Sequence, residues 1–142
     1  MDQRAAFLAA TYGTGSERLR LALAPGPLAA APSWAAGRWA IVTAWNPGGQ
    51  TQTQPQADNL RAERELLDLI ASRPYLAGVN GKGVWAEPSV ILPGLGLRQA
   101  AELGRRFGQA AVLFGVGRRV ALVWLEAGGV WVERFWAQLA DA

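Results

Sequence analysis

The stretch from Trp39 to Gln50, WAIVTAWNPGGQ, decides the fold that the sequence predicts. Its apolar run, Trp39–Trp45, does not alternate with polar residues and breaks at Asn46-Pro47-Gly48. Such a run is typical of a strand that is buried on both faces in the middle of a sheet. A strand that stops on polar residues and a Gly/Pro loop is typical of the ligand-binding edge of an α/β sheet. We therefore expect a central strand here, with a binding site where it ends.

The residues around this strand show helical and strand periodicities in alternation. The expected helices cover Asp2–Ala10, Gln54–Ser72, Leu97–Phe107 and, as a short one, Phe135–Ala142. The expected strands cover Glu17–Ala24, Val84–Leu92 (bulged or at an edge because of Pro88), Ala110–Gly115, Arg119–Glu126 and Val130–Arg134. Gly78–Gly83 is expected to be a turn, and Thr53 with Gln56 fits a capping box for the second helix.

This order of elements predicts the fold class. A strand–helix–strand–helix–strand series in the middle favours right-handed crossovers, and the last three strands favour an antiparallel meander. We expect one α/β (or α+β) domain over residues 1–142, a layered mixed β-sheet with helices packed on it. Gly104 lies inside an expected helix, and its expected role is close packing against a neighbouring element.

Composition excludes several kinds of chemistry. The chain has 142 residues, 51% of them hydrophobic and 18% charged, which indicates a globular protein. It contains no Cys and no His, so thiol nucleophiles, Cys/His zinc sites and Ser-His-Asp triads are excluded. The apolar runs are too short to span a bilayer and no signal peptide is evident, so we expect a cytoplasmic protein without a membrane partner.

The best candidate for catalysis is Glu87 in the segment Trp85-Ala-Glu-Pro-Ser89. In an extended segment Trp85, Glu87 and Ser89 share one face, and a carboxylate beside an indole has a raised pKa suited to general acid/base work. It would equally suit Mg²⁺, although no metal-binding motif supports a metal and no cofactor is predicted. The alternative is structural: Glu87 pairs with Arg61, Arg105 or Arg106, or caps a backbone amide.

Polar residues elsewhere are candidates for ligand binding. Asn46 either contacts a ligand at the strand end or simply shapes a tight turn. Asn59 lies near a helix N-terminus, where unpaired N–H groups can seat an anion, or ties the helix to the loop. The full set of ligand-binding candidates is Thr43, Asn46, Asn59, Trp85, Ser89 and Gln109.

Two other features suggest macromolecular partners. A basic run, which would bind nucleic-acid phosphates or form only a solvated face, consists of Arg98, Arg105, Arg106, Arg118 and Arg119. Seven Trp residues are many for this length, and Trp is enriched at subunit interfaces. We expect core or subunit contacts at Trp34, Trp39, Trp124, Trp131 and Trp136. The meander would leave one strand edge that a homodimer could cover.

Several segments together resemble a known family. They are TAWNP (43–47), Asn59 followed by Arg61, WAEPS (85–89) and FGQAAVLF (107–114). Over about residues 39–115 the chain is similar to a bacterial family labelled domain of unknown function 3293. The resemblance implies no activity. It implies recurring polar positions at Asn46, Asn59, Glu87, Ser89 and Gln109.

These observations support one functional hypothesis and two alternatives. The first is a domain that binds a small ligand or a nucleotide-like anion, with hydrolase-type chemistry at Glu87 if it is an enzyme. The alternatives are a nucleic-acid-binding accessory protein that uses the basic run, and a homodimeric interaction module without enzymatic activity.

Overall fold

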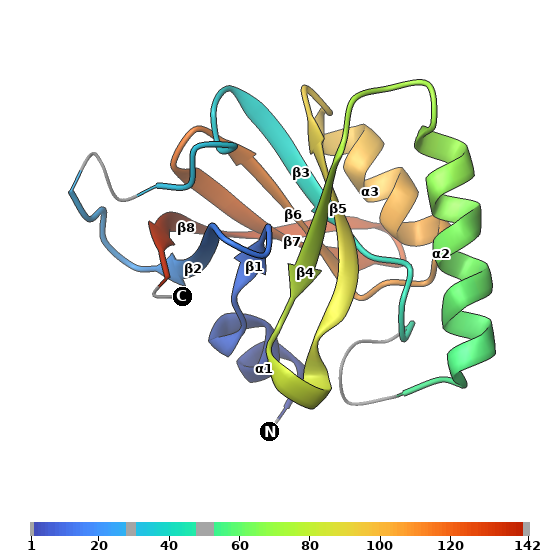
Figure 1. Cartoon of the computed structure of the whole chain (residues 1–142). Helices are drawn as coiled ribbons and strands as arrows, with labels where there is room; N and C mark the ends of the chain where they lie inside the picture. Colours follow the sequence, from blue (N-terminus) through green and yellow to red (C-terminus); the bar gives the residue numbers. More distant parts are fainter. Residues whose placement is uncertain (1, 28–30, 48–52, 141–142) are drawn as a thin grey trace.

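The computed structural model describes residues 2–27, 31–47 and 53–140, and within them the strands close into a barrel (Figure 1). The strands are β1 (Tyr12–Gly13), β2 (Arg18–Ala22), β3 (Arg38–Val42), β4 (Leu76–Asn80), β5 (Glu87–Pro93), β6 (Ala111–Val116), β7 (Arg119–Glu126) and β8 (Gly129–Leu139). The helices are α1 (Gln3–Ala9), α2 (Gln56–Ile70) and α3 (Leu97–Arg106), with a 3-10 turn η1 (Gly83–Trp85). Around the barrel the strand order is β1-β2-β8-β7-β6-β3-β5-β4.

The predicted layered α/β domain with a mixed sheet is wrong, because every paired strand in the described chain is antiparallel. The helix α3 joins β5 to β6, which run in the same direction. They are not neighbours, however, because β3 lies between them and pairs antiparallel with both. A strand–helix–strand crossover that skips one position in this way produces no parallel pair.

Two segments were assigned to the wrong kind of element. Phe135–Leu139 belongs to β8 and not to a C-terminal helix: Phe135 pairs with Val120 of β7 and Ala137 with Leu21 of β2. The last two residues of that expected helix, 141 and 142, lie outside the described residues. Gly78–Asn80 is part of β4 and not of a turn. Both segments are needed for closure, since β8 contacts β2 and β4 contacts β1.

The prediction that the strand beginning at Trp39 is central is confirmed, although β3 ends at Val42. Trp39 and Ile41 point into the barrel, where they join a core with Leu113 and Leu122. Ala40 and Val42 point outward, into a second core. This second core is covered by α2 and α3, which lie beside each other on one side of the barrel (Figure 1). The strand is apolar on both faces because it separates these two cores.

Packing inside the barrel depends on Trp39, whose large side chain faces a glycine on the neighbouring strand. Trp39 is 0% exposed, donates from Nε1 to the carbonyl oxygen of Gly117 at 3.0 Å and meets the ring of Trp34 edge-on at 5.1 Å. Gly115 lies opposite Trp39 on β6, and a Cβ there would overlap the indole ring. Glycine at 115 is therefore required by space.

Glycine has the same role in α3, as the sequence predicted. A Cβ at Gly104 would lie 2.6 Å from Cδ1 of Leu125 and from Cγ1 of Val112, so the helix packs closely against β6 and β7. The capping box predicted for Thr53 and Gln56 is wrong. The helix α2 begins at Gln56 after Pro55, and no side chain among the described residues caps its first turn.

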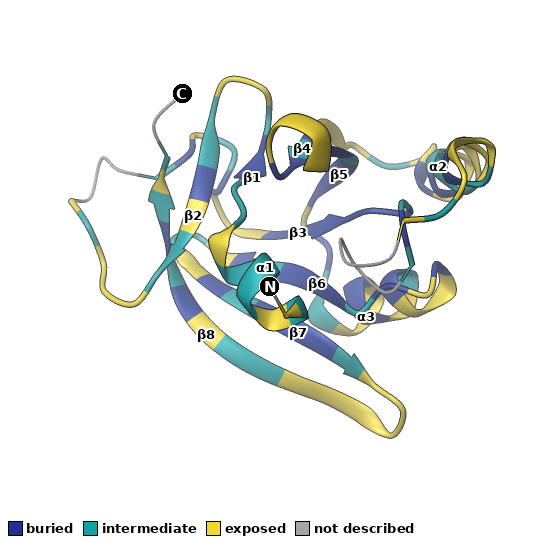
Figure 2. Ribbon diagram, turned by 90° about the horizontal axis from the view of Figure 1, so that it is seen from below, coloured by how far each residue is buried: buried dark blue, intermediate teal, exposed yellow. Residues whose placement is uncertain are grey.

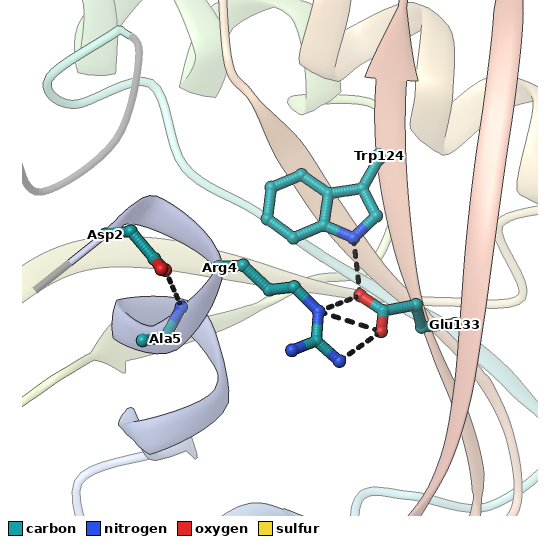
Figure 3. A network of polar contacts seen from close by, with 5 residues as sticks. All are labelled: Asp2, Arg4, Ala5, Trp124 and Glu133. Carbon is teal, nitrogen blue, oxygen red and sulfur yellow. Dashed lines mark hydrogen bonds and ion pairs between the residues drawn. The ribbon is translucent and has the colours of Figure 1, made fainter.

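The short helix α1 lies across one end of the barrel (Figure 2). Asp2 caps it by accepting a hydrogen bond from the N–H of Ala5 at 2.7 Å. Arg4 forms an ion pair with Glu133 of β8 at 2.6 Å, and the same carboxylate accepts from Nε1 of Trp124 at 2.8 Å (Figure 3). The ring of Phe7 meets Trp124 edge-on at 5.2 Å. These contacts fix α1 against β7 and β8.

Closure of the barrel removes one argument for a homodimer. The meander was expected to leave an uncovered strand edge, but β7 lies between β6 and β8, and β8 lies between β7 and β2. Trp34, Trp39 and Trp124 are in or against the core of the barrel, whereas Trp131 on the β7–β8 hairpin is 53% exposed. No helix in the described chain has the length and hydropathy needed to cross a membrane.

We predict that Gly115→Ala lowers the free energy of unfolding by about 1–3 kcal/mol, the usual cost of forcing an atom into a filled core. Gly128→Ala is the control, because nothing lies within 4 Å of a Cβ at that position. Urea denaturation of the three proteins measures the difference. Equal midpoints for Gly115→Ala and Gly128→Ala would show that the Trp39 ring does not require glycine at 115.

Candidate functional site

The side chain of Asn46 joins three segments at the end of β3. Asn46 has a positive φ of 45°, which Asn adopts more readily than most residues. Its Nδ2 donates to Oε2 of Glu87 at 2.6 Å, and its Oδ1 accepts from the backbone N–H of Gln54 at 2.9 Å. Asn59 of α2 donates to the same Oδ1 at 3.1 Å and accepts from the N–H of Asn46 at 2.9 Å. The predicted turn role of Asn46 and the predicted tie between Asn59 and the loop are therefore two parts of one network.

Glu87, the first residue of β5, is a buried carboxylate. It is 6% exposed, and burial raises its pKa above the ordinary value, while the hydrogen bond from Asn46 partly opposes that rise. The alternative of an arginine partner for Glu87 is not what the structure shows. Arg61 pairs with Asp58, Arg106 pairs with Glu65, and Arg105 donates to the carbonyl oxygens of Glu126 and Gly129. No ion pair within the described residues involves Glu87.

Two further residues line up with Glu87 across the barrel wall. Tyr12 pairs with Asn80 between β1 and β4, and Asn80 pairs with Glu87 between β4 and β5. The pKa of Tyr12 is raised by burial and then by the charge of Glu87, and its hydroxyl donates to the carbonyl oxygen of Phe7 at 2.5 Å. Asn80 is 9% exposed, and its buried Oδ1 has no hydrogen-bond partner among the described residues.

Sequence reasoning missed both Tyr12 and Asn80. Their strands are short, and Gly13 and Gly81 next to them favour turns in any local interpretation. The one sequence signal that could have indicated Asn80 is its position two residues after Gly78. In a strand that spacing places both on one face, opposite Glu87 and Ser89.

Glu87 lines two hollows. The first, the outer pocket, has a volume of about 180 Å³ and is bordered by Trp45, Trp85, Gln54, Asn59, Asn46 and Glu87 among others. Trp85 is 55% exposed and forms part of its rim. The second, the inner cavity, has a volume of about 30 Å³ at the end of the barrel beneath α1. Its polar wall consists of Tyr12, Thr43, Asn80, Glu87 and Gln109.

The other predicted ligand-binding residues lie nearby in separate contacts. Thr43 donates to the carbonyl oxygen of Pro88 at 2.8 Å and accepts from the N–H of Trp45. Gln109 donates to the carbonyl oxygen of Trp45 at 2.9 Å. Ser89 is buried, and its Oγ has no partner in the described chain. Glu87 and Ser89 share one face of β5, as predicted. Trp85 belongs to η1 and does not share that face.

The five arginines of the basic run do not come together. Arg105 and Arg106 end α3 close to the start of β6, whereas Arg118 and Arg119 lie at the other end of β6. The six residues of β6 span about 20 Å at about 3.3 Å each. Arg98 pairs with Glu102 on α3, and the guanidinium groups of Arg118 and Arg119 both lie over the ring of Trp136.

Among the described residues, no group of three or more His, Cys, Asp or Glu side chains is placed to hold a metal ion. The described residues that line the two hollows supply one buried carboxylate, several amides and hydroxyls, and two tryptophans.

We predict that Glu87→Gln changes how stability depends on pH. Because the pKa of Glu87 is raised in the folded protein, its contribution to stability is present at acidic pH. That contribution is lost as the pH rises from the ordinary value of 4.5 through the raised pKa. The free energy of unfolding of Glu87→Gln relative to the natural protein should therefore rise over this range, by about 1.4 kcal/mol for each pKa unit of difference.

Urea denaturation from pH 4 to pH 8 measures this difference, and Glu126→Gln, at an exposed position, is the control. A constant difference between Glu87→Gln and the natural protein across that range would contradict the burial of an ionisable carboxyl group.

Comparison with known proteins agrees with the resemblance seen in the sequence. A search of curated proteins and a search of solved structures found no match. The family model described as "Protein of unknown function (DUF3293)" matches residues 42–112, half of the chain. This region begins at the end of β3, ends in β6 and contains Asn46, Asn59, Glu87, Ser89 and Gln109. The chain belongs to the DUF3293 family of proteins of unknown function.

Proposed function

We propose that this protein binds a small polar molecule in the outer pocket. The observation that carries the proposal is the buried carboxylate of Glu87, which has no cationic partner in the described chain and is held at the pocket by Asn46. A buried carboxylate without a cationic partner is costly for stability, and the single hydrogen bond from Asn46 leaves its other acceptor sites open. A ligand that supplies the missing hydrogen-bond donor would offset that cost.

The lining of the outer pocket favours some ligands over others. Its described residues include one carboxylate, several amide side chains and two tryptophans, but no Arg or Lys. Amide side chains form hydrogen bonds with both donors and acceptors of a ligand, and indole faces stack on planar or cationic groups. This combination favours a neutral or cationic molecule with N–H donors. It gives less support to a nucleotide-like anion, which would rely on the N-terminus of α2.

Acid/base chemistry at Glu87 is compatible with this proposal, but binding is the better supported function. The raised pKa of Glu87 brings it closer to neutrality, where a carboxyl group can accept or donate a proton. Hydrolysis also needs a nucleophile or an activated water. The neighbouring ionisable group is Tyr12. Its pKa is raised, and its hydroxyl already donates a hydrogen bond to the carbonyl oxygen of Phe7.

We predict that compounds which stabilise the natural protein in a thermal-shift panel lose most of their effect with Trp85→Ala. Trp131→Ala is a matched control, because Trp131 is 53% exposed and Trp85 is 55% exposed, and Trp131 does not border the pocket. The panel should contain nucleobases, nucleosides, nucleotides, amides and amines at equal ionic strength. Nucleotides as the only effective compounds would favour the anion hypothesis.

Glu87→Gln separates binding by charge from binding by shape. It keeps the size of the side chain but removes the negative charge, so affinity for cationic compounds should fall about tenfold or more, the loss of one charge-assisted hydrogen bond. Isothermal titration of each active compound measures the change. If affinity is the same for Glu87→Gln and the natural protein, Glu87 is not part of the binding site and the proposal fails.

A further inference from the structure

The inner cavity differs from the outer pocket in its position and in the residues that line it. It lies inside the end of the barrel, and the residues of α1 that border it are Ala6 and Phe7. Ile41, Ala111 and Leu113 supply most of its apolar wall. Its volume of about 30 Å³ suits about two water-sized groups, that is, one molecule with two non-hydrogen atoms.

The polar wall of the inner cavity offers several acceptors, and one of them is a buried oxygen without a partner in the described chain. Oδ1 of Asn80 is buried, lacks a partner in the described chain and belongs to a side chain that borders the cavity. Glu87 contributes a carboxylate. The hydroxyl of Tyr12 already donates to Phe7, so only its oxygen lone pairs are available.

The other two polar residues each donate a hydrogen bond to a backbone carbonyl oxygen. Thr43 donates to the carbonyl oxygen of Pro88, and Nε2 of Gln109 donates to the carbonyl oxygen of Trp45. An ammonium group has three donors and a positive charge, so it can donate to the unpaired Oδ1 of Asn80 and also offset the buried charge of Glu87, which water cannot do. An apolar wall beside the acceptors leaves room for a short alkyl group.

We propose that the inner cavity is a binding site for a small primary alkylammonium group, held by Asn80, Glu87 and Tyr12 beneath α1. The ammonium supplies donors to Oδ1 of Asn80 and to the carboxylate of Glu87, and its carbon lies against Ile41 and Leu113. This site shares Glu87 with the outer pocket but does not depend on the function proposed there.

The helix α1 forms the roof of the inner cavity through Ala6 and Phe7. The helix α1 is attached by the ion pair of Arg4 with Glu133 (Figure 3) and by the contact of Phe7 with Trp124. The hydrogen bond from Tyr12 to Phe7 adds a link from the barrel wall. Residues of α1 border the inner cavity but not the outer pocket, so α1 is the element whose substitution distinguishes the two hollows.

Methylammonium is the probe, and methanol is its uncharged counterpart of the same size. Each is titrated into the ¹⁵N-labelled protein at pH 7.5 and constant ionic strength, with NaCl as the counterbalance. Amide and side-chain resonances of Asn80, together with the amides of Ala6 and Leu113, report binding. We expect saturable shifts with methylammonium, and at least tenfold weaker effects with methanol.

Three variants locate the site. Ala6→Leu fills the cavity from its roof and should weaken methylammonium at least tenfold. Ala9→Leu, on the exposed side of α1, is the matched control and should change affinity less than twofold. Asn80→Leu removes the acceptor at similar size and should also weaken binding at least tenfold. If Asn80→Leu does not fold, Ala6→Leu alone decides.

Two results would overturn the proposal. One is equal binding of methylammonium and methanol, which would show that the cavity does not select a cation. The other is methylammonium binding that survives Ala6→Leu but is lost with Trp85→Ala, which would place the cation in the outer pocket. The second result would still support binding in the outer pocket. If instead no compound of the thermal-shift panel binds but methylammonium does, the proposed function fails and the inner site remains supported.

Discussion

The barrel depends on a strand of two residues. Tyr12 and Gly13 form β1, which pairs with β2 on one side and β4 on the other and so completes the ring. Gly13 has a φ of 141°, and a Cβ there would overlap the carbonyl oxygen of Glu17. Only glycine fits this position. Because closure removes every free strand edge in the described barrel, it also creates the enclosed end in which Tyr12, Asn80 and Glu87 lie side by side.

The strand β3 connects this closure to the candidate site. Its inner face carries Trp39 into the barrel against Gly115, and its outer face packs beneath α2 and α3. The chain that leaves β3 then reaches Asn46, whose side chain joins the loop, α2 and β5. The position of Glu87 is therefore set by contacts on both sides of the barrel wall. Close packing of this wall allows a buried carboxylate to persist with an amide and no cation as its partner in the described chain, since the packing resists the movements that would expose it to water.

Much of the local structure could be predicted from the sequence, but its assembly could not. Strands β3, β6 and β7 and helices α1, α2 and α3 follow from apolar periodicity, and Gly104 was correctly assigned to close packing. The C-terminal segment was predicted to be helical because its short apolar pattern suits either structure. Pairing with β2 and β7 made it a strand. The expected parallel crossovers failed because nothing local shows that β3 lies between β5 and β6.

For the candidate site, the sequence by itself determined which residues carry the chemistry. It excluded thiol and histidine chemistry. It indicated Asn46 at the end of a strand, Asn59 at the head of an apolar helix stripe and Glu87 beside a tryptophan in an extended segment. Only the tertiary structure decided that these three form one network, that Glu87 has no arginine partner among the described residues and that Tyr12 and Asn80 lie beside it. The physical reason is the separation along the chain over which each kind of interaction acts. Periodicity and turn preferences act over a few residues, whereas barrel closure, burial of charge and hydrogen bonds between distant strands depend on residues far apart in the chain.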